Sequence, residues 1–251
     1  MNSLESIIDE FNPVSLEETD TVKLMNRIDR KYWFHSSKLL KLLEQILPYY
    51  DILEINGHRL MDYQTIYFDT VNNEMYLNHH NRKLNRHKVR QRKYCSTDSS
   101  FLEIKFKTNK KRTIKERIQC DFEPNEFVNT ESQFINGKTP FKSNDLEPKL
   151  NNKFKRITLI HKDKLDRCTI DISPVFWNEN GKAKFEHLVI FELKRSRSLK
   201  SSPMIDLMRE LKIRQRGLSK YCTGRALLEQ DLKKNMFKPR LRFLDKEIIN
   251  N

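Results

Sequence analysis

Residues 85–94 (NRHKVRQRKY), 101–107 (FLEIKFK) and 111–118 (KRTIKERI) decide how this chain folds. In each segment the side chains alternate with a period of two, and turn-forming residues separate the segments, so the pattern predicts three consecutive β-strands. In the second segment, for example, Glu103, Lys105 and Lys107 share one face and the apolar residues share the other. The predicted meander therefore carries its cations on one face. Taken alone, such a face is also typical of the solvated side of an ordinary antiparallel sheet.

The balance of charges points to a polyanionic partner. The 251 residues carry a formal net charge of +14. Nucleic acid, an anionic membrane surface and phosphate-rich small molecules all fit such a charge. With five glycines in the chain, we find neither a glycine-rich phosphate loop nor a dinucleotide fingerprint. Any bound phosphate must therefore be held by side chains.

The sequence predicts a cytoplasmic protein without a membrane span. No apolar run approaches the ~20 residues that a span needs, and the N-terminus MNSLESIIDEF lacks the features of a signal peptide. The cysteines form no CxxC pair, so we expect reduced packing residues rather than a zinc site or disulfides. They are Cys95, Cys120, Cys168 and Cys222.

The chain divides into an N-terminal arm (1–24), one large domain (25–230) and a basic tail (231–251) that we expect to be partly ordered. Helices are predicted in the arm, from Ser36 or Ser37 to Leu47, from Ser202 onward, and from about 219 to 228. We expect loops around the adjacent His79 and His80 and over 177–184. Residues 121–148 read as irregular with a short helix.

The large domain contains eight predicted strands, at about 26–34, 61–69, 86–94, 100–107, 112–120, 154–162, 165–173 and 187–195. Eight antiparallel strands can close into a barrel that holds a small ligand. We therefore predict an α+β fold, with an eight-stranded antiparallel closed β-barrel and helices packed on its outside. The charged faces of the strands would then line the channel.

The inward-facing set is strongly basic. Its cations are Arg27, Lys31, Arg90, Arg92, Lys105, Lys107, Lys115, Arg117, Arg167 and Lys194, and its carboxylates are Asp29, Glu103, Asp171 and Glu192. Such a channel repels itself unless a polyanion fills it, and arginine and lysine both suit phosphate oxygens. The carboxylates could hold Mg²⁺ or Mn²⁺. Glu192, on the most apolar strand, is the first candidate ligand; a salt bridge to Lys194 or an arginine explains it equally well.

Seven motifs occur in order along the chain: RIDRKYWF (27–34), YFDT (67–70), NRKLNRHKVRQRKY (81–94), FLEIKFKTNKKRTIKERI (101–118), LDRCTID (165–171), VIFELKR (189–195) and GLSKYCTG (217–224). This series resembles the catalytic domain of the vacuolar transporter chaperone (VTC) family, within the triphosphate tunnel metalloenzymes. The resemblance covers about residues 22–227. It implies an eight-stranded tunnel that makes inorganic polyphosphate from ATP.

The resemblance also implies roles for individual residues. Phosphate would be bound by Lys31, Arg90, Arg92, Lys105, Lys115, Arg167 and Lys220, and Glu192 would bind Mn²⁺ or Mg²⁺. We take Arg90, Arg92, Lys105, Arg167 and Lys220 as the catalytic set, with Arg27, Lys31, Lys107, Lys115, Arg117 and Lys194 as further phosphate ligands.

The chain departs from the family pattern at two places. Arg27, Asp29 and Lys31 stand where hydrolytic members of the superfamily have an acidic E-x-E-x-K strand, which favours anion binding over two-metal hydrolysis. Gly217 stands where eukaryotic polymerases tend to carry a lysine, and Arg216 is the candidate substitute.

The expected function is a polyphosphate polymerase with ATP and inorganic polyphosphate as partners. A triphosphatase on the same fold and a non-catalytic polyanion-binding module are the alternatives. Binding of single-stranded nucleic acid usually requires aromatic rings on the basic face. Phe106 falls on the face opposite to Lys105, so we do not expect nucleic acid as a partner.

Overall fold

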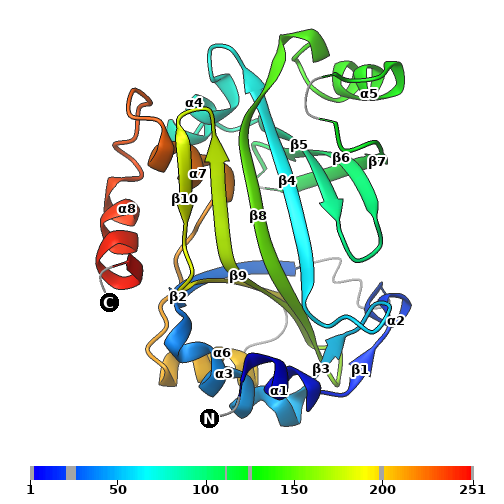
Figure 1. Ribbon diagram of the computed structural model, residues 1–251, viewed down its shortest axis with the longest axis vertical. Coiled ribbons are helices and arrows are strands. Elements are labelled where there is room, and N and C mark those ends of the chain that lie inside the picture. The colour runs from blue at the N-terminus through cyan, green and yellow to red at the C-terminus, as the bar shows by residue number, and fades with distance from the viewer. Residues whose placement is uncertain (1–2, 21–26, 111, 124–125, 198–200, 250–251) are drawn as a thin grey trace.

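The computed structural model describes residues 3–20, 27–110, 112–123, 126–197 and 201–249, which form one strongly curved β-sheet with helices around it (Figure 1). The order of the main strands is β2-β11-β9-β8-β4-β5-β6-β7, and three short strands, β1, β3 and β10, pair at its margins. Their bounds are β1 (Pro13–Val14), β2 (Arg27–His35), β3 (Tyr50–Leu53), β4 (Met61–Thr70), β5 (Arg86–Tyr94), β6 (Ser99–Lys107), β7 (Thr113–Gln119), β8 (Leu146–His161), β9 (Asp166–Asn178), β10 (Gly181–Lys184) and β11 (Leu188–Ser196).

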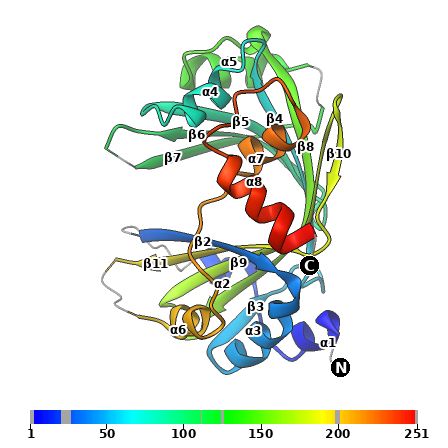
Figure 2. The ribbon, with the colours of Figure 1, turned by 90° about the vertical axis from the view of Figure 1, so that its left-hand side faces the viewer.

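The α+β class and the eight main strands agree with the prediction, but the closed barrel is not confirmed. The sheet ends at β2 on one side and β7 on the other, and no pairing joins these two strands within the residues described. The outer edge of β2 is instead met by the segment after α6, where the backbone N–H of Arg216 donates to the carbonyl of Lys31 at 2.8 Å. In Figure 2 the half of the sheet that contains β5, β6 and β7 faces the half that contains β2, β9 and β11.

Two strands are longer than predicted. β8 begins at Leu146, inside the region expected to be irregular, and a register shift between Lys153 and Lys155 lets it bend across the whole sheet. β9 runs on to Asn178 and turns through Gly181, whose φ of 140° suits glycine, into β10. The loop predicted over 177–184 is therefore wrong, because a hairpin replaces it.

The helices are α1 (Leu4–Asp9), α2 (Leu16–Asp20), α3 (Leu39–Ile46), α4 (Glu74–His80), α5 (Asn129–Lys138), α6 (Pro203–Glu210), α7 (Lys220–Leu228) and α8 (Lys238–Leu244). Short 3₁₀ turns cover Ser36–Lys38, Leu47–Tyr49 and Ser143–Asp145, and a π turn covers Asp245–Ile249. Among the described residues, no helix is both long enough and apolar enough to cross a bilayer.

One group of helices packs on the outer, apolar face of the sheet. α1, α3 and α6 lie together (Figure 2) and share a core with the apolar side chains of β2, β8, β9 and β11. Ser202 stands at the N-cap position of α6 without a side-chain capping hydrogen bond, and Pro203 opens the helix as the sequence predicts. This layer covers the apolar face of the sheet, and the charged face lines the concave side.

Two predictions about local structure are wrong. His79 and His80 end helix α4 instead of lying in a loop, because the Asp69 carboxylate accepts the backbone N–H groups of Met75 and Tyr76 and stabilises the first turn. The basic tail, which we expected to be partly ordered, is helical from Lys238 to Ile249. α8 follows the buried Phe237 and places Leu244 in the core beside Trp33, and the π turn after it adds Ile248.

All four cysteines are free thiols. Cys168 and Cys222 are buried among apolar side chains, and Cys95 and Cys120 are partly exposed.

Candidate functional site

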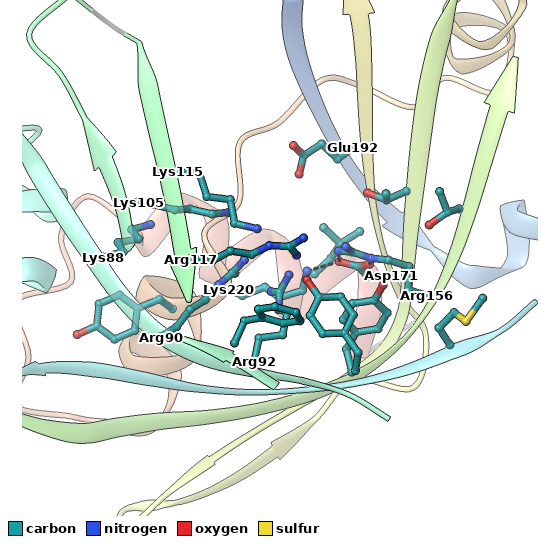
Figure 3. Close-up of a pocket in the computed structure, with 18 of the residues that line it drawn as sticks. Lys88, Arg90, Arg92, Lys105, Lys115, Arg117, Arg156, Asp171, Glu192 and Lys220 are labelled. Atoms are coloured by element: carbon teal, nitrogen blue, oxygen red, sulfur yellow. Dashed lines mark hydrogen bonds and ion pairs between the residues drawn. The ribbon is translucent and has the colours of Figure 1, made fainter. Parts of the chain in front are cut away.

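The concave side of the sheet encloses a cavity of about 900 Å³. The cations that line it come from β2, β5, β6, β7, β8, β9, β11 and α7, and several of them point into it in Figure 3. They are Lys31, Arg86, Lys88, Arg90, Arg92, Lys105, Lys107, Lys115, Arg117, Arg156, Arg167, Lys194 and Lys220, against the carboxylates Asp29, Asp62, Asp171 and Glu192. The wall is therefore strongly cationic.

The register of the meander places like charges next to each other. Lys88 pairs with Lys105, and Lys105 pairs with Lys115, so three lysines form one row across β5, β6 and β7. Like charges directly opposite each other destabilise a sheet. This row is unfavourable in an ordinary solvated sheet, and a bound anion would relieve it.

Glu103 is the buried carboxylate that pairs with cations of the meander. Its side chain is fully buried, and it accepts hydrogen bonds from Arg90 Nε at 2.6 Å and Nη2 at 2.5 Å. Lys115 forms an ion pair with its other oxygen. Burial opposes ionisation of Glu103, but Arg90, Arg92 and Lys115 prevail and lower its pKa. Arg90 is therefore held rigidly, with Tyr67 beneath its guanidinium group at 5.9 Å.

Asp171 organises a second group in the same way. Arg156 makes a bidentate contact to it, at 2.5 Å from Nε to Oδ1 and 2.8 Å from Nη2 to Oδ2, and Lys220 pairs with Oδ2. Burial disfavours the charged form of Asp171, yet the two cations lower its pKa. The Lys220 ammonium also lies 4.3 Å from the centre of the Phe154 ring. Three elements, β8, β9 and α7, thus meet at one carboxylate.

The sequence analysis missed Arg156 as a site residue. Its signal was present, because Arg156 and Thr158 share one face of this strand and Ile157 and Leu159 share the other. Arg156 also stands directly across from Asp171 in the register. Lys88 lies in the basic segment 85–94 but was not among the predicted site residues. It lines the cavity and donates to Ser219 Oγ at 2.8 Å.

Glu192 is held more loosely than the other two carboxylates. Its nearest ion-pair partner is Lys31, with 3.6 Å between Nζ and Oε2, rather than Lys194 or an arginine. Burial disfavours its charge, but Lys31, Lys194 and Lys105 lower its pKa to about 2. An ionised, weakly paired carboxylate faces the cavity here (Figure 3).

Five lysines that line the cavity have their pKa lowered below the usual lysine range. The charge of Arg90, followed by burial, moves the pKa of Lys105 well below its usual range. Burial lowers the pKa of Lys115 to about 8 despite its contact with Glu103, and it also lowers the pKa of Lys88, Lys194 and Lys220. These shifts follow from ammonium groups that are removed from water and lie beside other cations.

The structure gathers nearly all of the predicted site residues around this cavity. Those that line it are Lys31, Arg90, Arg92, Lys105, Lys107, Lys115, Arg117, Arg167, Glu192, Lys194 and Lys220. The side chain of Arg27 lies outside the part of the chain that the structure describes. Arg216 is not among the lining residues; it stacks on Phe243 at 3.7 Å and lines a separate pocket of about 230 Å³. It therefore does not substitute for a lysine at Gly217.

No curated protein matches the sequence. Solved structures that resemble the fold do so distantly. One is a protein of Vibrio parahaemolyticus described as an adenylate cyclase candidate, with 10% identity and a TM-score of 0.46 over 78% of this chain and 95% of that one. Another is HpAC1 of Hippeastrum, an adenylyl cyclase candidate described as having a dominant triphosphatase activity, with 13% identity and a TM-score of 0.48 over 82% and 99%.

Comparison with protein-family models identifies a family for most of the chain. The VTC domain model matches residues 26–229, which include every strand that lines the cavity; of the lining residues, Leu16 lies outside the match. The match also contains Lys220 and the helix that carries it. The chain belongs to the VTC domain family.

Proposed function

We propose that this protein is a polyphosphate polymerase, which transfers the γ-phosphoryl group of ATP to a growing inorganic polyphosphate chain. The observation that carries the proposal is the cavity of the VTC domain, where rows of cations face an enclosed space with few carboxylates. Phosphoryl transfer requires positioning and charge neutralisation more than covalent chemistry from the protein. A pre-formed basic cavity supplies both.

Different side chains of the cavity would bind different parts of the substrate. Arg90, locked by Glu103, presents a fixed guanidinium group suited to two phosphate oxygens. Lys220 reaches the cavity from α7 and is steadied by Asp171. Lys105 and Lys115 add point charges, and a bound anion favours the protonated form of both. The acceptor would be the terminal phosphate of the chain, aligned by the same cations.

A divalent cation fits this site as a companion of the phosphate rather than as a resident of a protein cage. The described residues contain no cluster of three or more His, Cys, Asp or Glu side chains that could hold a metal ion. Glu192 can supply one anionic oxygen, and Mg²⁺ commonly takes one or two carboxylates with phosphate and water as the remaining ligands. Bound Mn²⁺ or Mg²⁺ would neutralise charge on the transferring phosphoryl group.

Product analysis tests the proposal. Purified protein incubated with ATP and Mn²⁺ should form long chains that exopolyphosphatase degrades. Release of free phosphate without chains would support a triphosphatase instead. Binding of tripolyphosphate without turnover would support a binding module, and displacement by single-stranded RNA as readily as by ATP would contradict a phosphate-specific cavity.

Arg92→Ala is the variant that most directly tests whether the cavity binds phosphate. Arg92 faces the cavity and contacts Thr65 Oγ1 at 3.3 Å, so its loss leaves no buried carboxylate unpaired, whereas loss of Arg90 would strand Glu103. We expect roughly tenfold to hundredfold weaker binding of tripolyphosphate, as for the loss of a charge-assisted hydrogen bond. The matched control is Lys93→Ala, the next residue on β5, which pairs with Asp98 outside the cavity.

A further inference from the structure

A second, smaller pocket lies at the outer edge of β2. Its volume is about 230 Å³, and none of its lining residues also lines the main cavity. Its walls come from β2, the 3₁₀ turn at Ser36–Lys38, the segment 212–216 and α8, which lies beside β2 in Figure 2. The pocket is therefore a separate feature of the fold.

Four cations line this pocket, and no carboxylate does among the described residues. The cations are Lys38, Lys212, Arg214 and Arg216. None of the four forms an ion pair with a carboxylate in the described part of the chain, and the Lys38 ammonium donates to the backbone carbonyl of Leu211 at 3.0 Å instead. Cations gathered without a counter-charge repel one another, so an anion would stabilise this group.

Aromatic rings, rather than an acid, fix the guanidinium group of Arg216. Its central carbon lies 3.7 Å from the centre of the Phe243 ring and 5.9 Å from that of Trp33. Stacking leaves the N–H donors in the plane of the group, and no acceptor for them is found in the ranges that the structure describes. Arg216 is thus held in place with unused donors, which suits bidentate binding of a phosphate.

The backbone that carries Arg214 and Arg216 is held at both ends. At the end of α6, the N–H of Ile213 donates to the carbonyl of Met208 at 2.8 Å in a helix-terminating turn, and the Ile213 side chain is buried in the core. At the other end, the N–H of Arg216 donates to the carbonyl of Lys31. The two arginines therefore start from fixed positions on the wall of the pocket.

Trp33 adds a donor that lacks an acceptor. Only 2% of its surface is exposed, and the described residues offer no hydrogen-bond partner for its indole Nε1–H. A buried donor without a partner is unfavourable. An oxygen atom bound at this wall of the pocket would satisfy it.

We propose that this pocket is a second anion site, which binds one compact phosphate group. The guanidinium groups of Arg214 and Arg216 bind its oxygens, and the indole of Trp33 adds a neutral donor. With about 230 Å³ against about 900 Å³ in the main cavity, the pocket suits a single phosphate better than a chain. Inorganic phosphate and the phosphoryl group of a small phosphomonoester share this chemistry. The site is independent of the proposed polymerase activity, because the two pockets share no residue.

The indole N–H signals of the protein report on this site directly. The chain has two tryptophans, Trp33 and Trp177, and Trp177 lines neither pocket. In proton–nitrogen correlation spectra of ¹⁵N-labelled protein, the variant Trp177→Phe identifies the signal of Trp33. Titration with inorganic phosphate should shift the Trp33 indole proton downfield until the site is saturated, while the Trp177 signal stays in place.

Arg214→Ala should weaken this response of Trp33 roughly tenfold, as for the loss of a charge-assisted hydrogen bond. Arg214 makes no hydrogen bond or ion pair within the described residues, so its loss should leave thermal unfolding unchanged. The matched control is Arg209→Ala, which removes an exposed arginine of α6 outside the pocket and should change the response less than about twofold. Arg92→Ala, in the main cavity, should also leave the response of Trp33 intact.

Three results would overturn the second site. One is a Trp33 signal that stays in place at millimolar phosphate, and another is an equal shift with acetate, which would show no preference for phosphate. The third is a response that is lost in Arg92→Ala but kept in Arg214→Ala, since the phosphate would then occupy the main cavity. Glycerol phosphate distinguishes the two sources: tighter binding than inorganic phosphate indicates a phosphomonoester, and weaker binding indicates free phosphate.

Discussion

Two walls of the cavity differ in how charged side chains are paired across their strands. The meander wall (Lys88, Arg90, Arg92, Lys105, Lys115 and Arg117 on β5, β6 and β7) sets cation against cation, and Glu103 is its single buried counter-charge among the described residues. The mixed wall (Asp29, Lys31, Arg156, Asp171, Glu192 and Lys194 on β2, β8, β9 and β11) pairs opposite charges across neighbouring strands. The meander wall has too few carboxylates to balance its cations, whereas the carboxylates of the mixed wall balance most of its cations.

The difference shows what each wall is suited to do. Cations that lack enough counter-charge gain most when phosphate arrives, so the meander wall should dominate affinity. The mixed wall changes little in net charge and offers the carboxylate of Glu192, so it should govern orientation and metal use. Four experiments test this division, ordered from the largest expected effect.

Glu103→Gln should have the largest effect on stability. It removes the charge that Arg90 and Lys115 share, and breaking one side of a buried ion pair costs about 3–5 kcal/mol. Urea unfolding measures the loss. Glu116→Gln on β7, whose partner Lys138 is exposed, should stay within about 0.5 kcal/mol. Equal effects of the two variants would contradict the view that Glu103 supports the meander wall.

Gly224→Ala should disturb the mixed wall through α7. A Cβ atom at Gly224 would lie 2.6 Å from Leu150 Cδ2 and 2.7 Å from Phe176 Cδ1, so helix and sheet must separate. We expect a loss of about 1–3 kcal/mol from this overpacking, together with weaker phosphate binding because Lys220 moves with the helix. Thermal unfolding and tripolyphosphate titration measure both. Gly137→Ala in α5 meets no atom within 4 Å and should be neutral or slightly stabilising.

Anion binding should depend on pH through the meander wall. Lys115 has its pKa lowered to about 8 by burial, and Lys105 is shifted in the same direction. Because phosphate favours the charged ammonium, binding takes up protons near pH 8, and affinity falls as pH rises through this value. Without ligand the sign is reversed for these lysines: the unfolded chain holds their protons more tightly, so their contribution to stability increases from about pH 8 towards the ordinary lysine pKa.

Calorimetric titration of tripolyphosphate in buffers with different ionisation enthalpies measures this proton uptake. Lys115→Arg keeps the charge and should reduce the uptake while preserving affinity. Binding without any proton uptake near pH 8 would show that these lysines are already fully charged in the free protein.

Glu192→Gln should have the smallest effect on stability. Its pair with Lys31 is loose at 3.6 Å and partly exposed, so we expect a change below about 1 kcal/mol. Tripolyphosphate binding without metal should be unchanged or slightly stronger, whereas the gain in affinity on adding Mn²⁺ should disappear. A gain that persists in Glu192→Gln would place the metal elsewhere.

Much of the site was predictable because alternation along a strand is a local property. The faces of residues 86–94 and 101–107 were correctly assigned from the period of two, and most of the inward cations line the cavity. Arg156 was missed although it shares a strand face with Thr158, because one cation in a strand does not by itself indicate a site. Its role becomes clear only beside Asp171, which belongs to another strand.

The order of amino acids by itself determined which side chains share a face, because a side chain's direction in a strand depends only on its position in the alternation. Tertiary structure alone decided which faces meet: it joined Arg156, Asp171 and Lys220 at one point, left β2 and β7 without pairing to each other over the described residues, and packed the basic tail against Trp33. Those outcomes depend on contacts between residues far apart in the chain, whose geometry is set by the packing of the whole sheet and its helices.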